Sequence, residues 1–253
     1  MRLDLATWPE VEAYLGRSRG IVIPAGSTEQ HGPMGLIGTD AICAERVAAG
    51  AADLAGAMVA PTLAYTPAPF NLGFPGTVSV PEALFEHLVD EILSSLEVHG
   101  FDRFYFVNGH GANLAPLERA AATVRERASA DVRIRSWWDF EPVNALRSAY
   151  YGDWEGMHAT PSEVAITQST HRTVPAGLAV SPPEPLPPGY VERHAGDRHG
   201  PPDEHRRRFP DGRVGSHSAL ATPEHGAALL ETAAAAVAED YAAFTAGGSR
   251  EPA

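Results

Sequence analysis

The sequence predicts an α/β fold in which a mostly parallel sheet is covered by helices on both faces. Two observations support this prediction. Short runs rich in β-branched and aromatic residues alternate with helical patterns along the chain, which is typical of a parallel sheet between helices. The length of 253 residues is close to the upper limit of a single α/β domain. We therefore expect one domain over residues 1–253.

Four apolar runs of strand length are expected to form the sheet, at residues 21–25, 58–61, 104–107 and 132–137. Four helices are expected at residues 41–51, 81–99, 114–127 and 223–246. The first strand ends in Gly26 and Ser27, and Thr39 or Asp40 can cap the helix that follows it. Thr222 and Pro223 can begin the last, alanine-rich helix.

The helix expected at residues 81–99 has the clearest pattern. Pro81 suits a first helical turn, and Gly100 can end the helix. One apolar stripe recurs every four residues and is predicted to face the core. It consists of Leu84, Leu88, Ile92 and Leu96.

Residues 182–213 are rich in proline, glycine and charge. We interpret this segment as a surface excursion of the same domain rather than as a second domain. Further histidines lie in or after it, but His194 and His199 are five residues apart, which is a poor ligand spacing on a helix. We therefore expect these histidines to lie on the surface: His194, His199, His205, His217 and His225.

The composition excludes several kinds of chemistry. All 19 basic residues are arginine, so a lysine Schiff base and a phosphate-loop lysine are both excluded. Cys43 is the single cysteine, which rules out an internal disulfide, a thiolate zinc site and an iron–sulfur cluster. The 32 carboxylates and 11 histidines remain as metal ligands and proton carriers.

The charge balance also limits the partners. The formal net charge of −13 argues against nucleic acid or an anionic membrane as a partner, since both attract clustered cations. No stretch has the ~18 uninterrupted apolar residues of a membrane span, and the N-terminal residues lack a signal peptide's apolar region. With one cysteine, a cytoplasmic location is expected.

The first informative segment, residues 26–33, directly follows a predicted strand and contains Glu29 and His31. Residues two apart in an extended segment point the same way, and Asp40 follows nine residues after His31. Because α/β sheets build sites at the carboxyl ends of their strands, these three side chains can converge on one cation. The alternative is that Asp40 only caps a helix while Glu29 and His31 lie on a loop surface.

The second segment, residues 108–113, follows another predicted strand and contains His110 between Gly109 and Gly111. The glycines allow a sharp turn, which gives the imidazole room at the end of the strand. A single histidine in such a turn is more often structural than a ligand. Its position nevertheless predicts that it faces the same edge of the sheet as Glu29.

The third segment, residues 154–163, contains Trp154, His158 and Glu163. Thr160 and Glu163 also fit a capping box, which would explain Glu163 without a metal. In either role, Glu163 would lie at a helix N-terminus, where a carboxylate is favoured.

Together the three segments resemble the creatininase (creatinine amidohydrolase) family. The similar segments occur in the family's order along most of the chain. They are residues 24–33, 38–40, 73–77, 108–113, 158–163, 212–215 and 219–222.

The resemblance implies a three-layer α/β/α sandwich, a hydrolase with a two-metal centre, and a homohexamer. Glu29, His31, Asp40 and His110 match metal ligands of the family, with Asp40 in the bridging position. Creatinine-hydrolysing members have a further liganding glutamate where this chain has Ala112, and branches with a small residue there use the glutamate that matches Glu163.

The ligand set suggests two divalent cations. With a bridging hydroxide, they would balance the three carboxylates Glu29, Asp40 and Glu163, which otherwise repel one another. Oxygen and imidazole ligands suit Zn²⁺, Mn²⁺ or Fe²⁺. We expect a metal-bound hydroxide to attack the carbonyl carbon of an amide and His158 to carry the proton to the leaving nitrogen.

Several residues are expected to contact the substrate. Trp154 can stack on a flat molecule, and Trp137 or Trp138 can extend that wall, although packing in the core is the alternative for these two. Gly109 and Gly111 are expected to border the site beside His110.

The predicted activity is the hydrolysis of a non-peptide C–N bond in a small amide, cyclic amide or formamide. Creatinine itself is a less favoured substrate, because of Ala112 and because Gly111 stands where creatininase has a tyrosine. The alternatives within enzymes are a formamidopyrimidine deformylase and a peptide-trimming hydrolase. Outside enzymes, the alternative is a catalytically silent oligomeric scaffold or binding protein of the same fold.

Overall fold

The computed structural model describes residues 1–127 and 130–246. Residues 128–129 and 247–253 of the predicted domain lie outside the described part. At the centre is a parallel sheet with the strand order β2-β1-β3-β4. The strands are β1 (Gly20–Ala25), β2 (Met58–Val59), β3 (Arg103–Asn108) and β4 (Asp131–Ser136).

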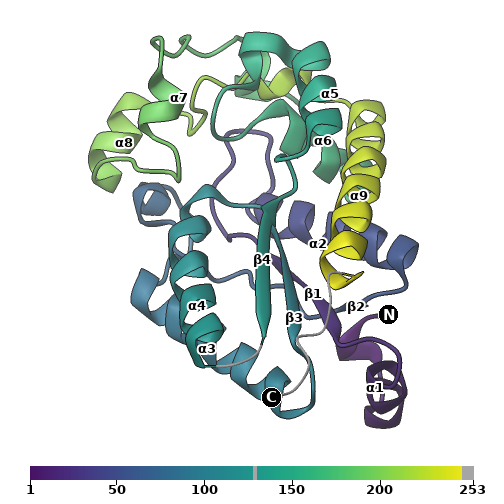
Figure 1. Cartoon of the computed structure of the whole chain (residues 1–253). Coiled ribbons are helices and arrows are strands. Elements are labelled where there is room, and N and C mark those ends of the chain that lie inside the picture. The colour runs from purple at the N-terminus through teal and green to yellow at the C-terminus, as the bar shows by residue number, and fades with distance from the viewer. Residues whose placement is uncertain (128–129, 247–253) are drawn as a thin grey trace.

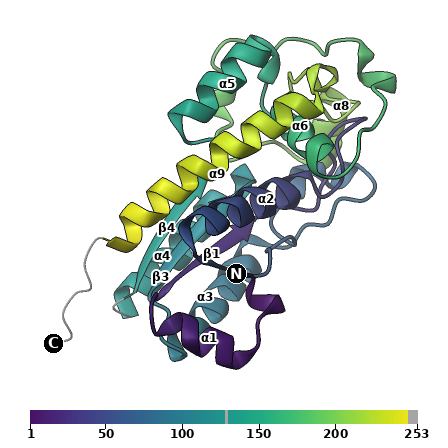
Figure 2. The ribbon, with the colours of Figure 1, turned by 90° about the vertical axis from the view of Figure 1, so that its right-hand side faces the viewer.

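Helices cover both faces of the sheet, which confirms the predicted three-layer α/β/α fold (Figure 1). On one face lie α1 (Trp8–Leu15), α3 (Glu82–Val98) and α4 (Leu114–Arg127). On the other face, α2 (Thr39–Ala55) and α9 (Pro223–Ala246) run side by side (Figure 2). The remaining helices are α5 (Glu141–Tyr151), α6 (Pro161–Thr170), α7 (Tyr190–Arg193) and α8 (Pro202–Arg208).

The two central strands explain the continuous apolar runs in the sequence. All residues of β1 and β3 are buried, because helices cover both faces of the sheet. Ile21 and Ile23 pack into the core beneath α3 and α4, whereas Val22 packs into the core beneath α2 and α9. The side chains of one strand therefore hold both outer layers in place.

The close packing of α2 against α9 corrects the predicted end of the first long helix. The prediction ended that helix at Ala51, but it continues to Ala55 and ends at Gly56, whose φ is +65°. Gly50 lies within the helix, and its lack of a side chain lets α9 pack directly against it. A Cβ atom at Gly50 would lie only 2.9 Å from Ala234 Cβ.

The predicted core stripe of α3 is wrong. The fully buried positions are Phe85, Val89 and Leu93, whereas Leu84 and Leu88 are 54% and 43% exposed. The helix carries two adjacent apolar stripes with the same four-residue period, so periodicity alone does not identify which one faces the sheet. The bulky Phe85 belongs to the stripe that does.

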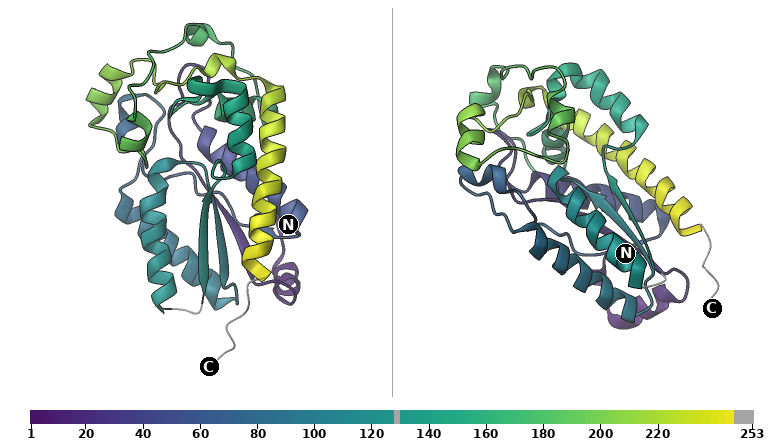
Figure 3. Two further views of the ribbon diagram at one scale, coloured as in Figure 1. Left: turned by 45° about the horizontal axis from the view of Figure 1, so that its top comes forward. Right: turned by 60° about the vertical axis from the view of Figure 1, so that its left-hand side comes forward.

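Residues 182–213, which include α7 and α8, fold over the end of the molecule toward which the strands run (Figures 1 and 3). Most of their side chains are exposed. α5 and α6 lie at the same end of the molecule (Figure 1). None of the helices in the described ranges combines the length and the apolar character needed to cross a membrane.

Candidate metal centre

The five predicted metal ligands meet at the carboxyl end of the sheet. Glu29 and His31 lie on the segment that leaves β1, and His110 lies just after β3. Asp40 and Glu163 lie in the first turns of α2 and α6. All five side chains are buried. Parallel strands bring segments that are distant in the sequence to one edge, which is why these residues can converge.

Asp40 lies at the centre of the group. The expected cap of α2 was Thr39 or Asp40, but the N-cap is Gly38, which places Asp40 within the first turn. The peptide dipoles at this helix N-terminus favour its negative charge. Its Oδ1 lies 2.8 Å from His31 Nε2 and its Oδ2 lies 3.0 Å from His110 Nδ1, so one carboxylate contacts both imidazoles.

Backbone carbonyls orient the two histidines. His110 Nε2 lies 2.8 Å from the carbonyl oxygen of Pro67, and His31 Nδ1 lies 3.2 Å from that of Glu29. A carbonyl only accepts, so these two nitrogens carry the hydrogen. The other nitrogen of each ring faces the carboxylates. Histidine ligands of metals are usually held in this way, with one nitrogen on a backbone acceptor and the other on the ion.

Glu163 has both of the roles considered for it. Its Oε2 accepts hydrogen bonds from the Thr160 backbone N–H at 3.0 Å and from Thr160 Oγ1 at 2.8 Å. The Glu163 N–H in turn donates to Thr160 Oγ1 at 3.2 Å, which completes the capping box at the start of α6. The same carboxylate also lies close to His31 and Asp40.

The ligand atoms form two groups of three that share Asp40. Glu29 and His110 complete one group, and His31 and Glu163 complete the other. The ligand atoms within each group lie within 4.8 Å of one another. Glu29 Oε1 and His31 Nε2 are buried and form no hydrogen bond of good geometry with the described residues, although charged partners lie nearby. Such atoms, directed at a common point, fit divalent cations.

The electrostatics of the protein alone also point to missing positive charge. Burial raises the pKa of Glu163 to about 7, and the neighbouring Asp40 raises it as well. Burial would lower the pKa of His31, but Asp40 and Glu163 raise it to about 10. The pKa of His110 is raised well above its usual value, because Glu29 and Asp40 outweigh burial. Metal binding would therefore displace protons from this site.

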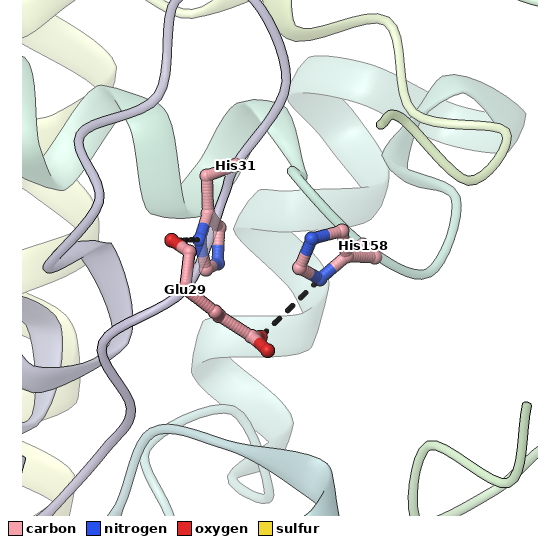
Figure 4. Close-up of side chains that lie close together, drawn as sticks. All are labelled: Glu29, His31 and His158. Carbon is pink, nitrogen blue, oxygen red and sulfur yellow. Dashed lines mark hydrogen bonds and ion pairs between the residues drawn. The ribbon is translucent and has the colours of Figure 1, made fainter. Parts of the chain in front are cut away.

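His158 lies beside Glu29 and His31 (Figure 4). Its Nδ1 is 3.7 Å from Glu29 Oε1, and its ring centre is 4.5 Å from that of His31. Its Nε2 lies 2.8 Å from the carbonyl oxygen of Gln30. Burial and the nearby His31 hold the pKa of His158 well below its usual value. Glu29, His31 and His158 form a further group that could hold an ion, so the geometry is compatible with either a ligand or a proton carrier.

A cavity of about 450 Å³ adjoins this site and is of a size to take a small molecule. The predicted substrate contacts Gly109, Gly111 and Trp138 line it, as do Asp40, His110, His158 and Glu163. Trp154 is not among its lining residues. Its ring instead packs edge-on against His217 at 5.7 Å and borders a separate hollow.

Two glycines of the cavity wall are explained by close contacts. A Cβ atom at Gly109 would lie 2.4 Å from the backbone oxygen of Asp40, and one at Gly111 would lie 2.3 Å from Asp197 Oδ2. Any side chain at either position would force its neighbour to move. Trp137 is 1% exposed and lies in the core, which leaves Trp138 as the tryptophan of the wall.

Asp197 was not predicted from the sequence, and two histidines were predicted to lie on the surface but are buried. Asp197 comes from the segment 182–213 and lines the cavity, with Oδ2 3.7 Å from His110 Nδ1. His199 and His205 were expected on the surface, but the His199 side chain is 2% exposed and His205 is 4% exposed. Both rings pack against Phe70. No spacing in the sequence marks these positions, since they depend on how the segment folds back.

Comparison with known proteins identifies the family. A family model described as "Creatininase: Creatinine amidohydrolase" matches residues 4–241. The "Mycofactocin precursor peptide peptidase" of Mycolicibacterium smegmatis is 40% identical over 111 residues, which are 42% of this chain and 44% of that protein. The "3-dehydro-scyllo-inosose hydrolase" of Thermotoga maritima is 33% identical over 106 residues, 42% of this chain and 34% of that protein. The matches therefore span less than half of either relative.

Solved creatininase structures share the fold. A creatinine amidohydrolase (creatininase) structure has a TM-score of 0.79 at 24% identity, over 98% of each chain. A manganese form and a Zn–Zn form of a creatininase variant are each 25% identical, with TM-scores of 0.77 and 0.76. Each match covers 96% of this chain and 98% of the other.

Proposed function

Because this chain belongs to the creatininase (creatinine amidohydrolase) family, a family of hydrolases, we propose that it uses two divalent cations to hydrolyse a non-peptide C–N bond of a small amide. The observation that carries this proposal is the pair of buried ligand groups that share Asp40. A carboxylate shared by two sets of ligands would hold two cations close together, as in a two-metal centre.

Each residue has a defined part in this proposal. Glu29 and His110 would hold one cation, His31 and Glu163 the other, and Asp40 both. Zn²⁺, Mn²⁺ and Fe²⁺ all suit these oxygen and imidazole ligands. When bound, such cations lower the pKa of a water molecule and polarise a substrate carbonyl.

His158 is the proposed proton carrier. Its lowered pKa keeps the imidazole neutral near pH 7, so that it can accept a proton and pass it to the leaving nitrogen. It lines the cavity, and its Nδ1 faces the carboxylate of Glu29 at 3.7 Å. Trp138 would provide an apolar wall for the substrate. Contact between Trp154 and the substrate stays a prediction.

The substrate class is a small amide, a cyclic amide or a formamide, including the formamide of a formamidopyrimidine. A peptide-trimming activity is the second candidate, and the match to a relative named as a precursor peptide peptidase favours it. A catalytically silent scaffold would have no need to keep five buried ligands beside a cavity.

The test compares metal content and hydrolysis in the purified chain and two variants. The protein is loaded with Zn²⁺, Mn²⁺ or Fe²⁺ and assayed on cyclic amides, formamides and short peptides. We expect two ions per chain, and we expect Asp40→Asn to lose both ions and at least 100-fold of the activity, because it removes the shared carboxylate.

Asp53→Asn is the matched control, because Asp53 is an exposed carboxylate on the same helix. It should keep both ions and full activity. Retention of two tightly bound ions by Asp40→Asn, or hydrolysis that does not depend on added metal, would contradict the proposal.

The proposal also includes a homohexamer in the cytoplasm. Leu84 and Leu88 form an exposed apolar stripe on α3 that a neighbouring subunit could cover. Light scattering coupled to size-exclusion chromatography measures the assembly directly.

A further inference from the structure

Asp197 reaches the cavity from an unusual backbone conformation. Its φ is +55°, one of two positive values among the described non-glycine residues. Asp tolerates this left-handed region better than most residues, but it is still uncommon there. Gly196 before it also has a positive φ, of +74°. The turn directs the Asp197 side chain inward, and only 10% of that side chain is exposed.

The two oxygens of Asp197 have different surroundings. Oδ2 accepts a hydrogen bond from the Ala112 backbone N–H at 3.0 Å, which fixes the carboxylate against the segment after β3. Oδ1 has His199 Nε2 at 3.9 Å, beyond hydrogen-bond distance, and accepts no hydrogen bond from the residues that the structure describes. The carboxylate is therefore anchored through one oxygen and can bind a donor through the other.

The glycine at position 111 makes this placement possible. Because a Cβ atom there would lie 2.3 Å from Asp197 Oδ2, a side chain at 111 and the Asp197 carboxylate exclude each other. Because position 111 is a glycine, the Asp197 carboxylate can lie beside His110. A side chain at position 111 would fill that space.

His110 Nδ1 lies 3.7 Å from Asp197 Oδ2, so the positive charge near this carboxylate is on the side of the anchored oxygen. Arg147 also lines the cavity, but its Nε is paired with Glu155 at 2.9 Å and its Nη1 donates to Asn144 at 2.7 Å. Asp197 is not part of either ligand group that shares Asp40. Glu192, an acidic residue outside the proposed metal ligands, also borders the cavity. The wall beside the proposed cations is therefore negative overall.

We propose that Asp197 is a specificity-determining residue that binds an ammonium or other strong N–H donor of the substrate. This inference rests on the proposed function. It adds a substrate class to that function, namely small amides that also carry a cationic group.

The test measures the binding of two matched probes to the zinc-loaded protein at pH 7.5 by titration calorimetry. 4-(Aminomethyl)benzamide carries a cation, whereas 4-ethylbenzamide has the same shape without the charge. A charge-assisted hydrogen bond predicts that the wild type binds the cationic probe roughly 10-fold more tightly or better. Asp197→Asn should remove most of this preference while changing the affinity for 4-ethylbenzamide less than about twofold.

The variants separate a binding role from other roles. Asp197→Asn keeps an oxygen that can accept from the Ala112 N–H. Glu192→Gln removes the other carboxylate of the wall that lies outside the proposed metal ligands, and it should keep the preference. If Asp197→Asn lost affinity for both probes equally, Asp197 would have a structural role instead. If the variant lost zinc, Asp197 would be a metal ligand. Either result overturns the inference, as does a wild type that shows no preference or does not bind the cationic probe.

Hydrolysis of the same two probes separates this inference from the proposed function. If the wild type prefers the cationic probe but hydrolyses no amide with any metal, the proposed function fails while the binding role of Asp197 stands. If amides are hydrolysed without any charge preference, only the role of Asp197 fails.

Discussion

The carboxylate of Glu163 accepts the hydrogen bonds of a helix cap and also lies within reach of His31 and Asp40. The two roles are compatible, because the cap uses Oε2 and a carboxylate has a second oxygen. Placing a further negative charge beside Asp40 in a buried site has a cost, which the raised pKa of Glu163, about 7, reflects. A cation bound there would offset this cost.

Glu163→Gln separates the two roles. Glutamine at this position still completes a capping box, so the metal-free variant should be more stable than the wild type at pH 8 by about 1–3 kcal/mol, because a buried charge is removed. The metal-loaded variant should hold one ion per chain rather than two. Urea unfolding in a chelator and metal analysis provide the two measurements.

Thr160→Ala is the complementary control for Glu163→Gln. It removes the capping hydroxyl, which should lower the unfolding free energy by about 1 kcal/mol and leave two ions bound. A Glu163→Gln protein that keeps two tightly bound ions would show that the carboxylate acts only as a cap.

Local sequence was enough to bring together the candidate ligands, because their signals are local. Glu29, His31 and His110 each follow an apolar strand, and strand ends of a parallel sheet converge. Asp197 has no such signal. Its position depends on how residues 182–213 fold over the site. It also depends on a positive φ at Asp197, which the sequence does not predict. Chain segments without periodic patterns carry too little local information to place a side chain.

At the scale of elements, α3 shows what the apolar periodicity of a helix predicts and what it does not. The existence of this helix and its end near Gly100 follow from the sequence, since Gly100 has a φ of +104° that ends the helix readily. The buried face does not follow, because two apolar stripes run along the helix and burial depends on its rotation against the sheet.

Two leucines of α3 provide a matched pair for testing the buried face. Leu93→Ala should lower the unfolding free energy by about 2–5 kcal/mol, because Leu93 is fully buried. Leu88→Ala should change it by less than about 0.5 kcal/mol in the monomer, because Leu88 is 43% exposed. Urea unfolding at a protein concentration that keeps the chain monomeric measures both. Similar losses for the two variants would contradict the observed orientation of the helix.

At the scale of the whole molecule, the segment 182–213 folds over the strand ends, where a cluster of aromatic and imidazole rings packs together. His205 lies 5.1 Å from Phe70 and 5.2 Å from Phe209, and 4.7 Å from His199, between ring centres. Neither His199 Nε2 nor His205 Nε2 has a hydrogen-bond partner among the described residues. These imidazoles are packed as neutral aromatic groups, so protonation works against the closed arrangement.

The pH dependence of stability should reveal these neutral histidines. Burial, and then the positive charge of Arg208, lowers the pKa of His205 to about 4. The unfolded chain binds a proton near pH 6.5, but the folded chain does so only near pH 4, so stability is lost as the pH falls through this window. His205 alone should contribute a slope of at most ~1.4 kcal/mol per pH unit there. Urea unfolding of the metal-free protein from pH 8 to pH 4 measures the total dependence.

His205→Phe removes the part that belongs to this residue, together with its effect on the pKa of the neighbouring His199. Phenylalanine suits the aromatic surroundings and cannot be protonated, so the variant should lose less stability than the wild type as the pH falls from 6.5 to 4. The difference in unfolding free energy between the two proteins at pH 8, where both have a neutral ring at this position, gives the cost or gain of packing alone.

Because Glu163 and Asp197 titrate in the same range in both proteins, their contributions cancel in the comparison. Parallel pH profiles for the wild type and His205→Phe would show that His205 is protonated in the folded chain as readily as in the unfolded one, and that the segment 182–213 does not seal its ring from water.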